Sequence, residues 1–279
     1  MSYHNLEEKK DLASKWFKSL RDEICLAFEQ IESEFGSSSA EFERKQWDRN
    51  GGGGGVISVM KGDIFEKVGV NISTVYGEFP EKFAKEIPGA ESNPGFWASG
   101  ISLVAHMKSP LIPAVHMNTR MVVTTKAWFG GGADLTPTFP DSKQTESFHL
   151  ELKKACDKFD SDYYPKFKKE CDEYFHIKHR KETRGVGGIF FDYLNTGDWD
   201  NDFNFTKEVG KAFINAYMPI VRQNALREWT AAQKEEQLIK RGRYVEFNLI
   251  YDRGTKFGLM TDGNIEAILM SLPPEVKWV

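Results

Sequence analysis

One alternating segment, residues 115–123, constrains the fold more than any other part of the chain. Its sequence is VHMNTRMVV, with apolar residues at these odd-numbered positions: Val115, Met117, Met121 and Val123. In a β-strand, successive side chains point to opposite faces of the sheet, so these residues face one side. His116, Asn118 and Arg120 face the other side, each about 6.7 Å from the next at about 3.3 Å per residue. The segment therefore predicts a strand with one buried face and one face that carries a titratable ring, an amide and a guanidinium.

The rest of the chain predicts an α+β fold. Helical spacing of apolar residues predicts helices over residues 6–34, 147–181 and 206–228. Apolar runs bounded by turn residues predict strands at 56–60, 115–129, 244–251, 256–260 and 265–272. Short strands joined by tight turns pair antiparallel, because parallel neighbours need a crossover of about a dozen residues or more. We expect a single domain over residues 1–279, in which a large, mainly antiparallel sheet carries helices on both faces and residues 1–45 form an N-terminal helical segment packed on it.

Composition excludes several classes of protein. The 37 Lys and Arg against 41 Asp and Glu give a net charge of -4, so no basic field exists to hold nucleic acid. No apolar run approaches the roughly 20 residues of a membrane span, and residues 1–16 lack the pattern of a leader peptide. We therefore expect a cytoplasmic protein with no integral membrane segment. Three cysteines, an odd number without metal-ligand spacing, indicate buried thiols: Cys25, Cys156 and Cys171.

The face with His116, Asn118 and Arg120 is the first candidate for chemistry. Arginine binds a carboxylate in a fixed two-pronged geometry, and histidine exchanges a proton near neutral pH. A solvated strand face is the alternative. Such faces usually carry Thr, Lys and Glu, so the His-Asn-Arg set favours a functional interpretation.

Ser102 and His106 lie four residues apart in an apolar stretch, residues 101–107, that fits either a strand or a helix. Both periods bring residues i and i+4 to one face. A Ser–His pair can serve a hydrolase, but the Gly-x-Ser-x-Gly elbow is incomplete, because Val104 stands where the second glycine is needed. Contact with a ligand is the better interpretation of this pair.

Histidines and glycines elsewhere give weaker signals. His106, His116, His149 and His179 could supply metal ligands, but their spacing matches no familiar ligand pattern and favours ordinary core or surface histidines. Glycine clusters at 51–55, 130–132 and 185–188 lack the partners of a phosphate-binding loop or a dinucleotide fingerprint. Close approach of the backbone to a flat ligand, or a tight turn, explains them better.

Taken together, the motifs resemble the oxygen-dependent coproporphyrinogen III oxidases over residues 47–278. They occur in the family's order: FEKVGVNIS at 65–73, Ser102-x-x-x-His106, His116-x-Asn118-x-Arg120, WFGGGADLTP at 128–137, KHR at 178–180, RGVGG at 184–188 and RYVEFNLIYDRGT at 243–255. The resemblance implies that two propionates of coproporphyrinogen III lose carbon dioxide and become vinyl groups, giving protoporphyrinogen IX in haem biosynthesis. Dioxygen is the oxidant, no organic cofactor is needed, and the family fold is a homodimer to which the stretch from about Tyr244 onward contributes.

The resemblance also implies roles for single residues. It gives catalytic roles to His116, Asp134, Asp252 and Arg253. It gives substrate contacts to Ser102, Asn118, Arg120, Gly263 and Asn264. It names four positions as ligands of a divalent metal in bacterial members, although we do not expect a metal requirement: His106, His116, His149 and His179.

Two departures from the family pattern stand out. Relatives carry an arginine where Asn264 follows Gly263, which leaves one propionate contact open. Relatives also continue for about a further helix beyond Val279, so either residues are missing here or the dimer edge is finished differently. Two other functions remain open from the residues: a histidine-ligated, metal-dependent oxygenase, and a tetrapyrrole-binding protein without catalysis.

Overall fold

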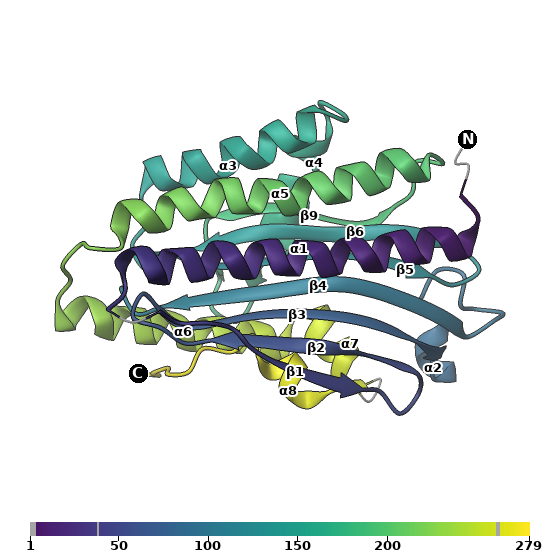
Figure 1. Ribbon diagram of the computed structural model, residues 1–279, viewed down its shortest axis with the longest axis horizontal. Helices are drawn as coiled ribbons and strands as arrows, with labels where there is room; N and C mark the ends of the chain where they lie inside the picture. The colour runs from purple at the N-terminus through teal and green to yellow at the C-terminus, as the bar shows by residue number, and fades with distance from the viewer. Residues whose placement is uncertain (1–3, 38, 261–262) are drawn as a thin grey trace.

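The computed structural model describes residues 4–37, 39–260 and 263–279. Its centre is a seven-stranded antiparallel sheet in the order β1-β2-β3-β4-β5-β6-β9 (Figure 1). The strands are β1 (Glu43–Asp48), β2 (Gly53–Met60), β3 (Phe65–Glu78), β4 (Gly95–Met107), β5 (Ala114–Val123), β6 (Ala127–Thr136) and β9 (Gly187–Leu194). The expected α+β class, with a mainly antiparallel sheet and helices on both faces, is confirmed.

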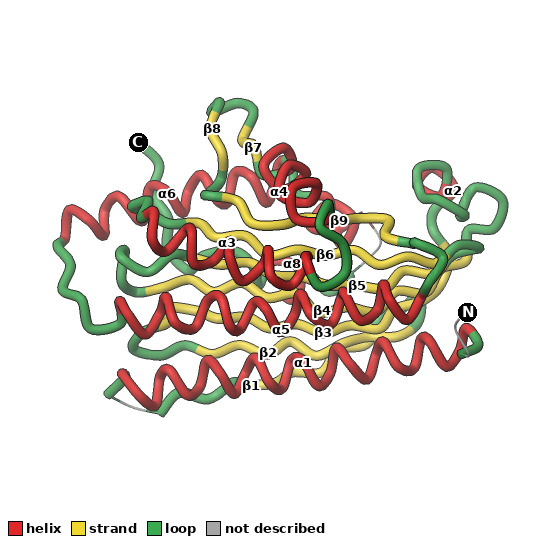
Figure 2. Tube along the Cα trace, turned by 90° about the horizontal axis from the view of Figure 1, so that it is seen from above, coloured by secondary structure: helices red, strands yellow, loops and turns green. Residues whose placement is uncertain are grey.

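One face of the sheet is closed by long helices. Figure 2 shows α1 (Leu6–Phe35), α5 (Trp199–Asn224) and α3 (Ser142–Asp157) side by side in front of the strands. Helix α1 begins at a capping box between Asn5 and Glu8. Its buried stripe recurs every three or four residues, as an amphipathic helix requires: Ala13, Phe17, Leu20, Ile24, Phe28 and Ile31. These side chains share one hydrophobic core with the buried residues of β5.

Near its C-terminal end, helix α1 is tied to the start of β3 by a buried carboxylate. The side chain of Glu32 is buried and accepts hydrogen bonds from the backbone N–H groups of Asp63, Ile64 and Phe65 at 2.8, 3.0 and 2.7 Å. One carboxylate thus satisfies a run of consecutive backbone donors. Glu32 therefore fixes how the helix lies on the sheet.

The opposite face of the sheet meets the C-terminal helices. These are α6 (Ala231–Ile250), α7 (Arg253–Met260) and α8 (Ile265–Leu269), seen behind and below the strands in Figure 1. Asn71 on β3 donates to the Ala267 carbonyl at 2.7 Å, and Gln237 on α6 donates to the Met107 carbonyl at 2.9 Å. Bonds from side chains to backbone carbonyls therefore seat these helices on the strands.

Several short elements complete the chain. Helix α4 (Tyr163–Tyr174) packs against β9, and α2 (Glu81–Ala84) lies between β3 and β4 in the sequence. Strands β7 (His176–Ile177) and β8 (Glu182–Thr183) form a separate two-stranded ribbon. As expected, the three cysteines are buried thiols, and burial raises the pKa of Cys25 to about 12. Within the described ranges, no helix is long and apolar enough to cross a membrane.

The structure corrects several boundaries that the sequence predicted. The strand expected at 115–129 is two strands, β5 and β6, joined by a turn at 124–126. The helical stretch 147–181 is α3 and α4 followed by β7, and the helix expected at 206–228 runs from Trp199 to Asn224. Residues 1–45, expected as an N-terminal helical segment, contain α1, which ends at Phe35, and the start of β1 at Glu43.

The strands expected at 244–251, 256–260 and 265–272 are wrong, because this region is largely helical. Helix α6 begins at a capping box between Thr230 and Gln233, well before the first expected strand. Its buried side mixes apolar and polar residues: Leu238, Tyr244 and Phe247 are apolar, whereas Gln237, Arg241 and Asn248 are polar and interrupt the apolar stripe. Hydrophobic periodicity therefore does not reveal this helix from the sequence.

We predict that Glu32→Ala lowers the free energy of unfolding by about 3 kcal/mol, because it leaves buried backbone N–H groups without acceptors. Urea denaturation measures the change. The matched control is Glu34→Ala on the same helix. Its side chain is 47% exposed and pairs with Arg222 at 2.9 Å, so we expect a loss below about 1 kcal/mol. Equal losses in the two variants would contradict the assigned role of Glu32.

Candidate active site

The even-numbered face of β5 forms the floor of the candidate site. Along β5 the odd-numbered residues are buried, whereas His116, Asn118 and Arg120 are only half-buried, as the alternation predicted. Strand register extends this face sideways: Ser102 on β4 lies opposite Asn118, and Asp134 on β6 lies opposite His116. These predicted site residues thus come from three neighbouring strands, and the antiparallel ladder fixes their spacing.

His116 is held by a carboxylate on one side and an amide on the other. Its Nδ1 lies 2.9 Å from Oδ1 of Asp134, and its Nε2 lies 3.2 Å from Nδ2 of Asn118. An ionised carboxylate can only accept, so Nδ1 carries the proton and Nε2 accepts from the amide. Asp134 therefore sets the tautomer and the orientation of the imidazole.

Asp134 in turn forms a buried ion pair with Arg184. One guanidinium nitrogen of Arg184 lies 2.8 and 2.7 Å from the two carboxylate oxygens, and both side chains are almost fully buried. Burial alone would raise the pKa of Asp134, but the Arg184 charge and the His116 hydrogen bond hold this pKa below its usual value. Asp134 is therefore a permanent carboxylate at neutral pH.

Aromatic rings surround the guanidinium of Arg184. Its central carbon lies 3.9 Å from the ring centroid of Phe175, 4.6 Å from that of Tyr244 and 4.9 Å from that of Phe247. Its Nη1 donates to the Asn248 side chain at 3.0 Å. Since two of these rings and the amide belong to α6, the support of His116 extends from the sheet into the helices that cover it.

Arg120 and Arg253 meet at one carboxylate, that of Asp192 on β9. The Nη2 of Arg120 lies 2.8 Å from Oδ1 of Asp192, and the Nη2 of Arg253 lies 3.8 Å from Oδ2. Arg120 also donates to Asn118 at 3.4 Å. Asp192 therefore contacts both Arg120 of β5 and Arg253 of α7, which are far apart in the sequence.

Asp252 caps helix α7 instead of forming a turn between the two strands expected there. Its Oδ2 accepts from the Thr255 N–H at 2.6 Å, and its Oδ1 accepts from the Tyr174 hydroxyl at 2.8 Å. The same hydroxyl accepts from the Arg253 N–H at 3.0 Å. Tyr174 thus anchors the first turn of α7 to α4, so Asp252 and Arg253 have fixed positions.

Gly263 and Asn264 lie between α7 and α8. The Asn264 side chain accepts from the Ala267 N–H at 2.9 Å and so caps α8, while the Gly263 N–H donates to the Gly258 carbonyl at 2.9 Å. Asn264 therefore serves as a helix cap where relatives are expected to carry an arginine. The other part of that loop, residues 261–262, lies outside the described residues.

Comparison with known proteins agrees with the motifs and their geometry. The family model described as coproporphyrinogen III oxidase matches residues 13–279. The chain is 64% identical over 275 residues to the oxygen-dependent coproporphyrinogen-III oxidase of Rickettsia akari (strain Hartford), covering 97% of this chain and 99% of that protein. It is also 64% identical over 276 residues to the protein of the same name from Rickettsia bellii (strain OSU 85-389), covering 98% of this chain and 99% of the relative. The chain belongs to the coproporphyrinogen III oxidase family.

The four histidines that the family resemblance offers as metal ligands do not converge in this member of the coproporphyrinogen III oxidase family. His106 is buried and its Nε2 bonds the Ser271 carbonyl at 2.9 Å; burial holds its pKa well below the usual value. His149, on α3, uses both ring nitrogens on the Val186 carbonyl and the Tyr164 hydroxyl, each at 3.0 Å.

His179 is likewise committed elsewhere, to the Tyr251 hydroxyl at 2.8 Å and to Glu246 at 2.7 Å. Across residues 4–37, 39–260 and 263–279, no three His, Cys, Asp or Glu side chains are grouped so that they could hold a metal ion. His106, His116, His149 and His179 therefore do not fit one metal centre.

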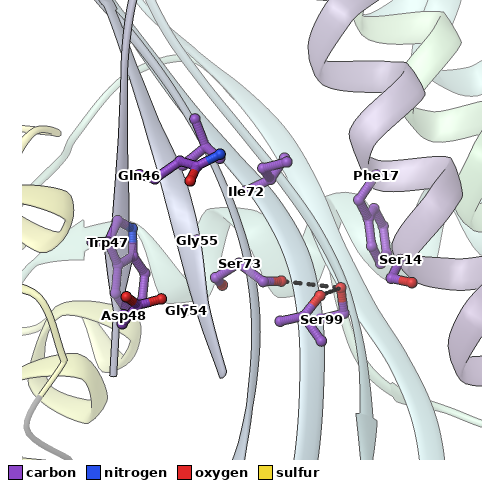
Figure 3. Close-up of a pocket in the computed structure, with 12 residues that line it drawn as sticks. Ser14, Phe17, Gln46, Trp47, Asp48, Gly54, Gly55, Ile72, Ser73 and Ser99 are labelled. Atoms are coloured by element: carbon purple, nitrogen blue, oxygen red, sulfur yellow. Dashed lines mark hydrogen bonds between the residues drawn. The ribbon is translucent and has the colours of Figure 1, made fainter. Parts of the chain in front are cut away.

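A cavity of about 350 Å³ lies away from this site. Figure 3 shows that Ser14 and Phe17 of α1 face strand residues such as Ser73 and Ser99 across it. The cavity is lined by α1 and β1 to β4, on the side of the sheet that the long helices cover. None of the residues that line this cavity belongs to the candidate site around His116, Asp134 and Arg120.

Sequence reasoning missed Arg184 and Asp192 as members of the site. Arg184 begins the RGVGG motif, in which the glycines and not the arginine carry the local signal. Asp192 ends the run Gly188, Phe190, Asp192, which alternates along β9. Because Gly188 pairs with Asp134, that alternation was the available signal for the position of Asp192.

We predict that Asp134→Asn lowers the free energy of unfolding at pH 7 by about 3–5 kcal/mol, because Arg184 is left buried without a counterion. The folded-state pKa of Asp134 lies below the ordinary value of 3.8, so its contribution is present above that value and is lost as the pH falls through the folded-state pKa. Denaturation of both proteins at several pH values measures the gap.

The gap between wild type and Asp134→Asn is expected to be constant from about pH 7 to pH 5 and to narrow below about pH 4. Glu266→Gln is the matched control. Its side chain is 66% exposed and pairs with Lys45, so we expect a change below about 1 kcal/mol. A gap that widens on acidification would refute the assigned state of Asp134.

Proposed function

We propose that this chain oxidatively decarboxylates two propionates of coproporphyrinogen III to vinyl groups, with dioxygen as oxidant, and so forms protoporphyrinogen IX in haem biosynthesis. The observation that carries the proposal is the meeting of Arg120 and Arg253 beside the His116–Asp134 pair. Two cations suited to a carboxylate thus lie next to a proton-exchanging group. Membership of the family supports the same substrate class. We place the reaction in the cytoplasm, without an organic cofactor.

The stoichiometry defines what the site must supply. A propionate side chain becomes a vinyl group by losing carbon dioxide and the equivalent of a hydride, that is, two electrons and a proton. Dioxygen takes the two electrons and two protons and becomes hydrogen peroxide. Each conversion therefore consumes one proton net from the protein or solvent, so the site needs a carboxylate anchor and a proton donor.

His116 is the proton donor in this proposal. Nδ1–H is engaged by Asp134, so the proton is exchanged at Nε2, which gives up its hydrogen bond from Asn118 when it bonds the substrate. The carboxylate of Asp134 orients the imidazole and is itself held ionised by Arg184. General acid catalysis of this kind is worth about 10²–10⁴-fold in rate.

Asp252 is the carboxylate that faces the pyrrole N–H groups in this proposal. Tyr174 and Thr255 each donate one hydrogen bond to it, and a carboxylate has about four lone-pair sites, so acceptor capacity remains. A fixed anion beside the pyrroles stabilises the positive charge that develops as electrons leave the ring system.

Dioxygen takes two electrons from the ring system and adds beside a pyrrole nitrogen as a peroxide. The peroxide takes one proton from the propionate chain and one from His116, and the ring–oxygen bond breaks to release hydrogen peroxide. The carbon–carboxylate bond breaks to release carbon dioxide, and its electron pair completes the vinyl group and the restored pyrrole.

The strand register supports the substrate contacts in this proposal. Ser102 and Asn118 lie opposite each other on β4 and β5, next to Arg120, and offer a hydroxyl and an amide to a second polar group of the substrate. Gly263 and Asn264 precede α8, which is bonded to β3 through Asn71 and the Ala267 carbonyl. Because Asn264 is used as a helix cap, we assign the propionate near it a neutral hydrogen bond in place of an ion pair.

We also propose a homodimer that forms through the region from about Tyr244 to the C-terminus. Support comes from large apolar side chains that stay exposed on the C-terminal helices: Leu249, Ile250, Leu259, Met260 and Ile265. Five such residues over a short stretch form the kind of apolar surface that a second copy covers.

The first test incubates the purified protein with coproporphyrinogen III, with and without dioxygen and with or without a chelator. We expect protoporphyrinogen IX to form only in air and at the same rate with chelator, and His116→Ala to lower kcat by about 10²-fold or more. Lys169→Ala is the control. It removes a cation on α4 whose side chain is 78% exposed, and it should keep wild-type rates.

Three outcomes point elsewhere. Loss of activity on chelation favours a metal-dependent oxygenase. Binding of the substrate without turnover favours a tetrapyrrole-binding protein that does not catalyse. Turnover in the absence of dioxygen contradicts the oxidant. Each outcome would overturn a different part of the proposal.

We predict that Ile265→Asp converts the dimer to a monomer, because the Ile265 side chain is 62% exposed on α8 and a buried, unpaired charge disfavours the interface. Sedimentation velocity measures the mass. The matched control, Leu226→Asp, changes a residue that is 76% exposed just after α5 and should stay dimeric. A wild-type monomer at micromolar concentration would refute the proposed dimer.

A further inference from the structure

The carboxylate of Asp192 is placed by an irregularity in the sheet. Along the β6–β9 ladder, Phe129 pairs with Leu194 and Gly131 pairs with Phe191. One residue of β6 therefore faces two residues of β9, Asp192 and Tyr193, which is a β-bulge. Bulges change the direction of a side chain and are frequent beside active sites.

The backbone at the bulge is strained. Tyr193 has a φ of +54°, the left-handed region that residues with a side chain rarely adopt. Its N–H donates to Oδ1 of Asp192 at 3.0 Å, which ties the strained residue to the carboxylate. The surrounding sheet thus holds Tyr193 in an unfavourable backbone conformation, and this conformation helps to position the Asp192 carboxylate.

A glycine makes room for the ion pair that crosses β6. A Cβ on Gly130 would lie 2.8 Å from Oδ1 of Asp192 and 3.0 Å from Cζ of Arg120. Arg120 is on β5 and Asp192 is on β9, so their side chains bridge the strand between them at this glycine. Gly130, the first residue of the glycine cluster at 130–132, therefore leaves the space in which the Arg120 and Asp192 side chains meet.

Arg253 reaches the same carboxylate from a different layer. It extends from the first turn of α7, with its guanidinium carbon 5.0 Å from the Tyr174 ring centroid and 5.4 Å from that of Phe190. The Asp192 side chain is only 14% exposed, so its charge is poorly screened by solvent. One half-enclosed anion thus faces two cations, one from the sheet and one from a helix.

We propose that Asp192 is the positioning residue that makes Arg120 and Arg253 a single clamp for one propionate. The two guanidinium groups repel each other, and the shared carboxylate offsets that repulsion. Each arginine has five N–H donors in a planar fork, so one that binds Asp192 keeps donors for a substrate carboxylate. This proposal rests on the proposed function, because it assumes that a propionate is the ligand.

The net charge of this cluster also distinguishes a propionate from the vinyl group that replaces it. Arg120, Arg253 and Asp192 together carry a net charge of +1, which one propionate neutralises. The vinyl group that replaces the propionate is neutral, so the clamp holds the converted side chain less tightly than the unconverted one. The clamp therefore favours side chains that still carry a carboxylate.

The test compares Asp192→Ala, Asp192→Asn and wild type in the turnover assay, with Glu34→Ala as the control. The Asn variant keeps the shape of the side chain, which guards against a loss of folding. Glu34 also pairs with an arginine, Arg222, but that pair joins α1 to α5 on the helical side of the molecule. Binding of the oxidised tetracarboxylate, coproporphyrin III, is followed separately by fluorescence.

We expect KM and the dissociation constant of coproporphyrin III to rise by about 10-fold to 100-fold in both Asp192 variants, with melting temperatures close to wild type. Added formate should restore much of the loss in Asp192→Ala, because a small carboxylate can bind between the two arginines. Chloride at equal ionic strength should not restore it. Glu34→Ala should match wild type throughout.

Two results would overturn the proposal. One is unchanged KM and porphyrin affinity in both Asp192 variants. The other is a loss that follows a lowered melting temperature and does not respond to formate, which indicates a structural role only. If wild type itself shows no turnover, the proposed function fails, whereas the porphyrin-binding measurements still decide the role of Asp192.

Discussion

The buried pair of Asp134 and Arg184 is the interaction on which the other features of the site depend. Removing two charges from water is costly, and the pair offsets this cost only because both charged groups are further engaged. The carboxylate binds Arg184 and His116, and the guanidinium lies among aromatic rings of α6 and the residues after α4. The pair therefore joins the sheet to the helices that cover it, and it fixes the orientation of His116.

One face of the sheet packs into the hydrophobic core, and the other carries the polar residues of the candidate site. On one face, α1 and α5 close an aromatic and aliphatic core that contains Phe17, Phe28 and Tyr217. On the other face, polar side chains stand at alternate positions of β5 and are covered only in part. A rigid core on one side keeps the polar groups of the other side at fixed distances. Such preorganisation allows charges to act without rearrangement during the reaction.

The sequence predicted what depends on local periodicity and missed what depends on distant contacts. Strand alternation placed His116, Asn118 and Arg120 on one face correctly, because a period of two needs no tertiary information. The strands predicted after residue 243 are wrong, because Gln237, Arg241 and Asn248 interrupt the apolar stripe on the buried side of α6. Arg184 and Asp192 acquire their roles from a partner 50 positions away and from a β-bulge. No local pattern indicates the role of Arg184, and the alternation along β9 gives the face of Asp192 but not the bulge that places its carboxylate.

Under the proposed function, the site explains how an acidic chain recognises an anionic substrate. The net charge of -4 provides no attractive field, so recognition has to be local. Along the face, cations and anions alternate from Arg184 through Asp134 to Arg120, Asp192 and Arg253, with His116 and Asn118 between them. Under the proposed function, a substrate carboxylate continues this alternation of charges where Arg120 and Arg253 share Asp192. The position of a carboxylate, and not the total charge of the ligand, then decides which side chain of the proposed tetrapyrrole substrate lies beside His116.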